Sequence, residues 1–228
     1  MTNSAIILHE SFNDPDAELW FTEPAGFTAL PLEALLPRPD SAAADELRTA
    51  VAPLLDAAPD EMARQQLIAQ FATAQQLLAA LREVGTVHCS IGLHRDDVAD
   101  VAGVSDPVPL FSLFTISWRE TAVAPRGVTA ARVVTAGEGR AGVEFVELSC
   151  GPAAFSESAS VPGAGSGLPR IPLLQLHAHL PHPDCGRLAV LTLTTTAPGR
   201  RDEYREILRL IAASVSFKSP SQVGRTHP

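Results

Sequence analysis

The sequence RLAVLTLTTTAPGRRDEYREILRLIAASVSF, residues 187–217, decides the fold. Within it, residues 188–196 consist mainly of leucines that alternate with threonines. This alternation predicts a β-strand with one apolar face and one hydroxylated face, because successive side chains of a strand point to opposite sides. Pro198 and Gly199 end the strand, since both residues favour turns.

An amphipathic helix is predicted to follow over residues 200–213. Its apolar side chains recur at three- and four-residue spacing, which places them on one side: Tyr204, Ile207, Leu208, Ile211 and Val215. Charged residues fill the opposite side. A single helix of this length is marginal in water, so we expect it to pack on a sheet, with a short strand at Ser216 after it.

Upstream of this segment, the period of the sequence predicts several more strands. Two short ones are expected at 5–9 and 18–22. Six longer ones are expected at 86–93, 110–120, 128–136, 142–148, 173–180 and 188–196. The stretch AGEGRAG, residues 136–142, predicts a hairpin turn. Short connections of this kind favour an antiparallel sheet. The Gly-, Ser- and Pro-rich residues 156–170 predict a mobile loop.

Residues 41–84 predict a pair of helices, 41–58 and 59–84, with Gly85 as the C-cap of the second. The second helix has an apolar stripe that we interpret as core: Leu67, Phe71, Ala74, Leu78 and Leu81. We therefore expect the pair to cover one side of the sheet. The predicted fold class is α+β, an antiparallel sheet of about six to seven strands flanked by helices. It forms one domain over 1–217, with the helical pair inserted and a disordered tail at 218–228.

The composition narrows the possible functions. The chain has 228 residues, with 17 basic and 26 acidic side chains and a net charge of −9. Nucleic-acid binding is not expected, because it requires clustered Lys and Arg. No membrane insertion is expected either, since no apolar run is long enough. The first residues lack the pattern of a signal peptide, and the three cysteines share no CxxC spacing. We therefore expect a cytoplasmic protein with reduced thiols.

One candidate metal site is present in the sequence LHAHLPHPDC. It offers nitrogen, oxygen and sulfur donors that suit Zn²⁺: His177, His179, His182, Asp184 and Cys185. Residues two apart on a strand share a face, so the two first histidines point the same way. The alternative interpretation is an exposed strand face followed by a polar turn.

A cysteine nucleophile is the other enzymatic hypothesis, at Cys150 before a Gly-Pro pair or at Cys89 beside a histidine. Neither cysteine can be paired with a base from the sequence. There is no GxSxG motif, P-loop or dinucleotide fingerprint. The sequence HRDD at 94–97 is interpreted as a charged turn. Trp20 and Trp118 are each candidates for either a binding surface or the core.

The two ends of the chain resemble a known group of proteins. FTEPAGFTALP near the start and the closing strand–helix–strand segment are similar to the PsbP-like α/β/α sandwich, at Phe21, Pro24, Gly26, Phe27, Ser216 and Phe217. That group includes an extrinsic photosystem subunit, a Ran-binding import factor and LpqN-type lipoproteins of high-GC bacteria. The helical pair is longer than this resemblance implies, and no lipobox cysteine stands near the start. Such proteins mostly act as interaction domains, so the resemblance implies binding and transfers no catalytic residue.

The leading functional hypothesis is a non-catalytic, cytoplasmic protein-binding module, such as an adaptor, chaperone or immunity-type factor of a larger assembly. Its acidic surface favours a partner with basic patches. No cofactor is expected, and the sequence leaves the oligomeric state open. Two alternatives stay open. One is a small metal-dependent or cysteine hydrolase centred on His177, His179 and Cys185, and the other is a carrier of a small apolar ligand.

Overall fold

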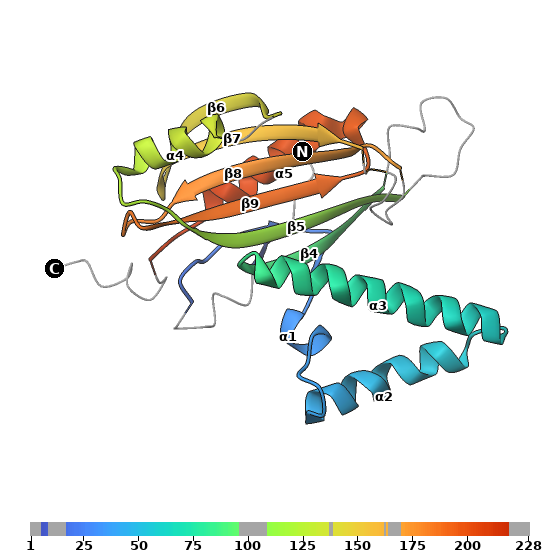
Figure 1. Cartoon of the computed structure of the whole chain (residues 1–228). Coiled ribbons are helices and arrows are strands. Elements are labelled where there is room, and N and C mark those ends of the chain that lie inside the picture. The colour runs from blue at the N-terminus through green and yellow to red at the C-terminus, as the bar shows by residue number, and fades with distance from the viewer. Residues whose placement is uncertain are drawn as a thin grey trace.

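A seven-stranded antiparallel sheet forms the centre of the computed structural model, which describes residues 6–8, 17–95, 109–136, 139–161, 163 and 170–218 (Figure 1). The strand order is β3-β4-β5-β9-β8-β7-β6. The strands are β3 Phe27–Ala29, β4 Thr86–Arg95, β5 Pro109–Glu120, β6 Ala141–Leu148, β7 Gly151–Ser160, β8 Leu173–Pro181 and β9 Arg187–Thr195. Helices flank this sheet, so the α+β class with an antiparallel sheet is confirmed.

One face of the sheet, called here the front face, is covered by helix α5 (Arg201–Ser214). A short 3-10 turn, η3 (Pro198–Arg200), links it to β9. The apolar side of the helix meets the apolar side of the central strands in one core, which includes Phe114, Leu176, Leu191, Leu193, Tyr204, Leu208 and Ile211. Thr192 and Thr194 of β9 alternate with these leucines and lie on the other face. The closing strand and helix were therefore predicted correctly.

A two-stranded ribbon extends the front layer beside α5. It pairs β1 (Ile6–Leu8) with β2 (Thr22–Pro24). The backbone N–H of Thr22 donates to Ser214 Oγ over 2.9 Å. Trp20 forms an isolated antiparallel bridge with Ser216, which is the expected short strand after the helix. The two ends of the chain are thus joined through backbone hydrogen bonds.

The opposite face of the sheet, the back face, is partly covered by helix α4 (Arg126–Thr135). Ala130 and Val134 of this helix pack on Ala154 of β7. The predicted strand at 128–136 and the hairpin turn at 136–142 were wrong. The valines of this segment favour a strand, but valine costs only about 0.7 kcal/mol in a helix, and burial of one helical face on the sheet outweighs that preference.

The predicted loop at 156–170 was wrong in its first third. Ser156–Ser160 belongs to β7 and pairs with Leu173–His177 of β8. Serine and alanine have little intrinsic preference for strands, so the sequence of this segment resembles a loop. Its hydrogen bonds to β8 decide its conformation instead. The charged turn predicted at 94–97 was wrong at His94 and Arg95, which belong to β4. Residues 96–97, residues 162 and 164–169 of the predicted loop, and the predicted tail after Lys218 lie outside the described residues.

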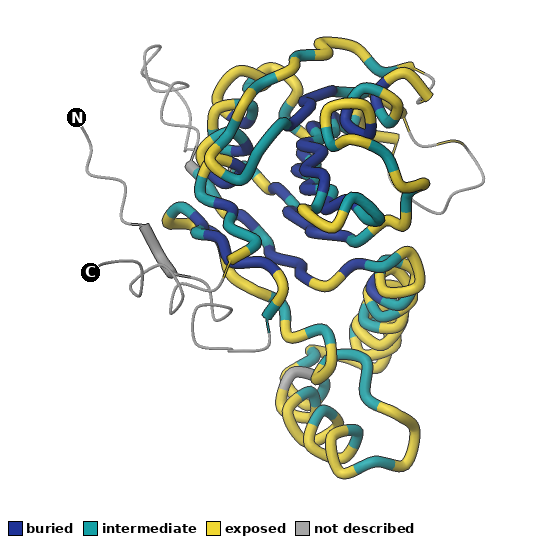
Figure 2. The backbone as a smooth tube through the Cα atoms, turned by 90° about the vertical axis from the view of Figure 1, so that its left-hand side faces the viewer, coloured by how far each residue is buried: buried dark blue, intermediate teal, exposed yellow. Residues whose placement is uncertain are grey.

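Helices α2 (Ala42–Asp56) and α3 (Glu61–Glu83) form an arm that projects away from the sheet, with the short helix α1 (Leu32–Leu35) at its base (Figures 1 and 2). Ser41 and Asp60 cap the N-termini of α2 and α3. Gly85 follows α3 with a φ of +82°, as its predicted C-cap role requires. The two helices were predicted correctly, but their position was not.

The predicted burial of the helical pair on the sheet was wrong. Within α3, only Leu78 is buried, and Leu67 and Ile68 are 38% and 42% exposed. Figure 2 shows exposed and half-buried residues along most of the arm, while the buried residues concentrate in the body. Gly85 joins the arm to the sheet, and only the end of α3 that precedes Gly85 lies near β4.

Among the described residues, no helix is long and apolar enough to cross a membrane.

Candidate functional site

The five candidate metal ligands are divided between two places. His177 and His179 lie on β8 and face the side of the sheet that carries α4, because they pair with Thr192 and Val190 of β9 and with Ser156 and Ala154 of β7. His182, Asp184 and Cys185 lie in the turn between β8 and β9. Within the part of the chain that is described, no three His, Cys, Asp or Glu side chains are grouped so that they could hold a metal ion.

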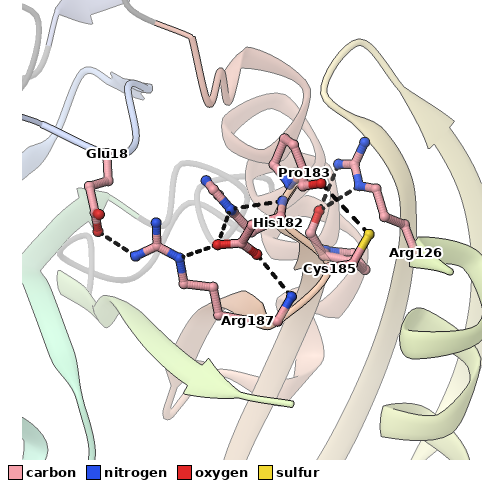
Figure 3. Close-up of polar contacts among 9 residues, drawn as sticks. Glu18, Arg126, His182, Pro183, Cys185 and Arg187 are labelled. Carbon is pink, nitrogen blue, oxygen red and sulfur yellow. Dashed lines mark hydrogen bonds and ion pairs between the residues drawn. The ribbon is translucent and has the colours of Figure 1, made fainter. Parts of the chain in front are cut away.

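The β8–β9 turn is organised around the carboxylate of Asp184 (Figure 3). It lies 2.8 Å from His182 Nδ1 and accepts from Gly186 N–H and Arg187 Nε, each at 2.9 Å. Arg187 also donates to Glu18 over 2.6 Å. Desolvation alone would raise the pKa of Asp184, but these donors lower it to about 2. Glu18 thereby ties the start of the chain to this turn.

Aromatic rings hold the same turn against the body. The guanidinium of Arg187 lies 4.7 Å above the Trp118 ring. The imidazole of His182 makes edge contacts with Trp118 and Phe217, at centroid distances of 5.6 and 4.9 Å. Trp118 is therefore engaged in packing, and Trp20 is buried as well. The polar turn, including Cys185, has the structural role that was the alternative to a metal site.

The two candidate nucleophiles are both poor ones. Cys89 is completely buried, and burial with a contribution from Glu23 raises the pKa of its thiol to about 11. Burial also raises the pKa of Cys150, although the nearby Arg126 opposes this effect. The Arg126 guanidinium itself donates to the carbonyl oxygens of Cys150 and Pro181. Figure 3 shows Arg126 beside the β8–β9 turn. Both thiols are protonated at neutral pH, so neither is an activated nucleophile.

A buried polar group that the sequence analysis missed joins the ribbon to the sheet. The Glu23 carboxylate of β2 is 2.8 Å from His88 Nε2 and accepts from Ser90 Oγ, also over 2.8 Å. The His88 ring packs against Phe21 and Phe114. His88 and Ser90 therefore both contact the same buried carboxylate. In the sequence, this polar group could have been found from His88 and Ser90, which stand at alternate positions of a mainly apolar strand.

An open, mainly apolar groove lies between α2 and α3. It has a volume of about 360 Å³ and is lined mainly by apolar side chains, among them Leu47, Val51, Leu55, Ile68, Phe71 and Ala72. It lies on the arm, away from the sheet. A pair of helices that buried its apolar faces internally would leave little such space, because protein interiors are closely packed.

The charges of the arm are distributed unevenly. Residues 65–81 of α3 contain no charged side chain, although this helix is largely exposed. Residues 40–61 carry one basic residue, Arg48, and six acidic ones: Asp40, Asp45, Glu46, Asp56, Asp60 and Glu61. A solvated helix normally has charged residues on its water-facing side. The arm therefore combines a helix whose middle section, residues 65–81, is uncharged with an acidic one, and the groove lies between them.

No family model, curated protein or solved structure that was compared with the chain matches it. The similarity to PsbP-like proteins therefore stays a prediction.

Proposed function

We propose that this protein is a non-catalytic protein-binding module whose docking element is the arm formed by α2 and α3. Its partner presents an amphipathic helix that has an apolar face flanked by basic residues. The observation that carries the proposal is the open apolar groove between the two helices of the arm. Helix-in-groove binding is a recurrent way in which one protein recognises another.

The dimensions of the groove suit a helix. Its lining spans Ala44 to Leu55 on α2 and Ile68 to Gln75 on α3. At about 1.5 Å per residue, the two walls are about 16 and 10 Å long, or roughly three and two helical turns. Apolar side chains at positions i, i+4 and i+7 of a docked helix would reach along this length. A third helix would also cover the apolar surface that α2 and α3 leave exposed.

The charges favour a basic partner over a second copy of this chain. Residues 40–61, which form α2 and the turn after it, have a net charge of −5 from one arginine and six carboxylates. The whole chain has a net charge of −9. A second copy would bring the same acidic segment, whereas Lys and Arg beside the apolar face of a partner helix would be attracted and would speed association.

Two further observations support a binding role in a reducing compartment. The thiols of Cys89 and Cys150 have raised pKa values, which does not suit covalent catalysis. All three cysteines are free, and we propose a cytoplasmic location on that basis. The predicted kinship with PsbP-like proteins, whose members mostly act as interaction domains, is part of the same proposal.

The test compares two variants of the full chain as tagged baits in the cells that make the protein. Phe71→Glu places a charge in the groove, and Val123→Glu places one at an 82% exposed apolar position outside the arm. We expect a partner that contains a basic amphipathic helix to bind the wild type and Val123→Glu, and to bind Phe71→Glu at least about tenfold more weakly.

Light scattering on the purified protein tests whether a second copy of this chain fills the groove instead. A dimer that Phe71→Glu dissociates would show that a second copy fills the groove, and it would overturn the proposed partner. Equal binding of the partner to Phe71→Glu and to the wild type would overturn the arm as the docking element.

A further inference from the structure

The guanidinium of Arg140 donates to two uncharged acceptors. It is half-buried, between α4 and β6, and its Nη1 donates to the carbonyl oxygen of Val133 over 2.9 Å and to His179 Nε2 over 3.1 Å. Among the described residues, no carboxylate forms an ion pair with it. Desolvation lowers its pKa, which means that the protein stabilises this charge poorly. Charges removed from water in proteins are normally paired, and a bound anion would pair with this one.

Arg140 also determines the tautomer of His179. An arginine can only donate, so His179 Nε2 must accept, and the ring proton lies on Nδ1. His179 is 1% exposed, and its Nδ1 has no hydrogen-bond partner within the described structure. Burial, with the charge of Arg140, lowers the pKa of His179 to about 3, so the ring is neutral at pH 7. The site thus holds a cation and a buried donor without an acceptor.

A second imidazole, that of His177, lies beside the imidazole of His179. The ring of His177 stacks on that of His179 with centroids 5.9 Å apart, and it is half-buried. Its Nδ1 lies 3.1 Å from Thr192 Oγ1. When the threonine hydroxyl donates to Nδ1, the proton of the neutral ring lies on Nε2, which becomes a donor. Burial lowers the pKa of His177 to about 4, so this ring is neutral as well.

Next to these residues, the described parts of β7, β8, β9 and α4 contribute no carboxylate to the back face. The strand register places hydroxyl, amide and imidazole side chains on this face of the three strands: Ser156, Ser158, Gln175, His177, His179, Thr192 and Thr194. Helix α4 contains no acidic residue. Glu147 of β6 lies on the same face but at the level of Pro152, two residues along β7 from Ala154, which pairs with His179.

We propose that Arg140, His177 and Thr192 form a binding site for the oxyanion group, a phosphate or a carboxylate, of a small ligand. Of the guanidinium nitrogens, only Nη1 has a partner in the described structure, which leaves Nε and Nη2 to bind two oxygens of the anion side by side. His177 Nε2 donates from the strand. This site lies on the back face of the sheet, apart from the arm, and is independent of the docking role.

Histidine side-chain NMR tests the proposal on the intact protein at neutral pH. Inorganic phosphate and acetate are added in separate titrations at constant ionic strength. We expect saturable shifts of the His177 resonances with at least one of the two anions, and the stronger response identifies the ligand class. Arg140→Gln should weaken that binding at least about tenfold. Arg132→Gln removes an exposed charge of α4 and should leave it unchanged.

Two results would overturn the site. One is the absence of saturation with either anion in the wild type. The other is an equal response of wild type and Arg140→Gln. Because Arg140→Gln also loses contacts to Val133 and His179, Thr192→Val provides a second variant that keeps the shape of the strand residue. This variant should weaken binding of the same anion. An unchanged affinity would show that neither Thr192 nor the orientation that its hydroxyl gives to the His177 ring contributes to the site.

Discussion

Helices α5 and α3 have similar apolar patterns but opposite surroundings. Helix α5 buries Tyr204, Leu208 and Ile211 on the front face of the sheet. Its charged side is fixed by ion pairs to the neighbouring strands, such as Arg201 to Glu157 at 2.7 Å. Helix α3 buries only Leu78 and has no charged residue over 65–81. Spacing of apolar residues thus predicts a helix with an apolar side, but it does not predict whether the same chain covers that side.

The largest expected difference between the two helices is in the cost of a leucine. Leu208→Ala should lower the free energy of unfolding by about 3 kcal/mol, because the side chain is 1% exposed within the core. Leu77→Ala on α3 should cost less than about 0.5 kcal/mol, because that side chain is 49% exposed. Urea unfolding of both variants checks this contrast. Equal costs would mean that the arm is packed as tightly as the body.

The body, unlike the arm, also contains buried histidines, and these make its stability depend on pH. The pKa of His179 is about 3 in the folded protein and near 6.5 in the unfolded chain. Between these values the unfolded state binds more protons, so stability is complete above about pH 6.5 and falls as the pH is lowered. Between about pH 7 and pH 4, the wild type should lose on the order of 3 kcal/mol more than His179→Gln.

Urea unfolding at several pH values measures this difference. The variant is a suitable control because glutamine keeps a carbonyl oxygen that can accept from Arg140. Parallel stability curves for the two proteins would contradict a neutral, buried His179.

Gly85, which connects the arm to the sheet, is expected to be sensitive to the addition of a single methyl group. Gly85 has a φ of +82°, and a Cβ added there would lie 2.6 Å from the carbonyl oxygen of Trp118. Gly85→Ala should therefore cost about 2 kcal/mol from backbone strain and the close contact. Gly127→Ala is a matched control, because a Cβ at that position meets no atom within 4 Å. Equal stability of both variants would show that the backbone at position 85 tolerates a side chain.

The comparison also explains which elements could be predicted from the sequence. The strand at 187–195 and helix α5 were predictable because the alternation of leucine and threonine and the helical spacing after it both agree with the final packing. Helix α4 was not, because its valines favour a strand and only burial of Ala130 and Val134 on the sheet selects the helix. The whole of β7 was missed, because its glycine, serine and alanine residues form a strand only through pairing with β6 and β8.

Local sequence patterns were also insufficient to predict the candidate sites. Proximity in the sequence suggested that His177 and Cys185 would act together, but they lie in a strand and in the turn after it. Arg140 was not found, because its contacts with His179 join residues far apart in the chain and no local pattern marks it. Of the apolar stripe predicted for α3, only Phe71 lines the groove, and such a stripe is equally expected for a core helix, so the groove itself was not predicted.

Hydrogen exchange of the protein with and without its captured partner tests the docking role of the arm most directly. The account predicts slower exchange of backbone amides in residues 44–55 and 68–75, which line the groove, when the partner is bound. The amides of α5 should be unaffected, because the sheet already covers that helix. Unchanged exchange in the arm, together with protection confined to the sheet or its loops, would contradict the account.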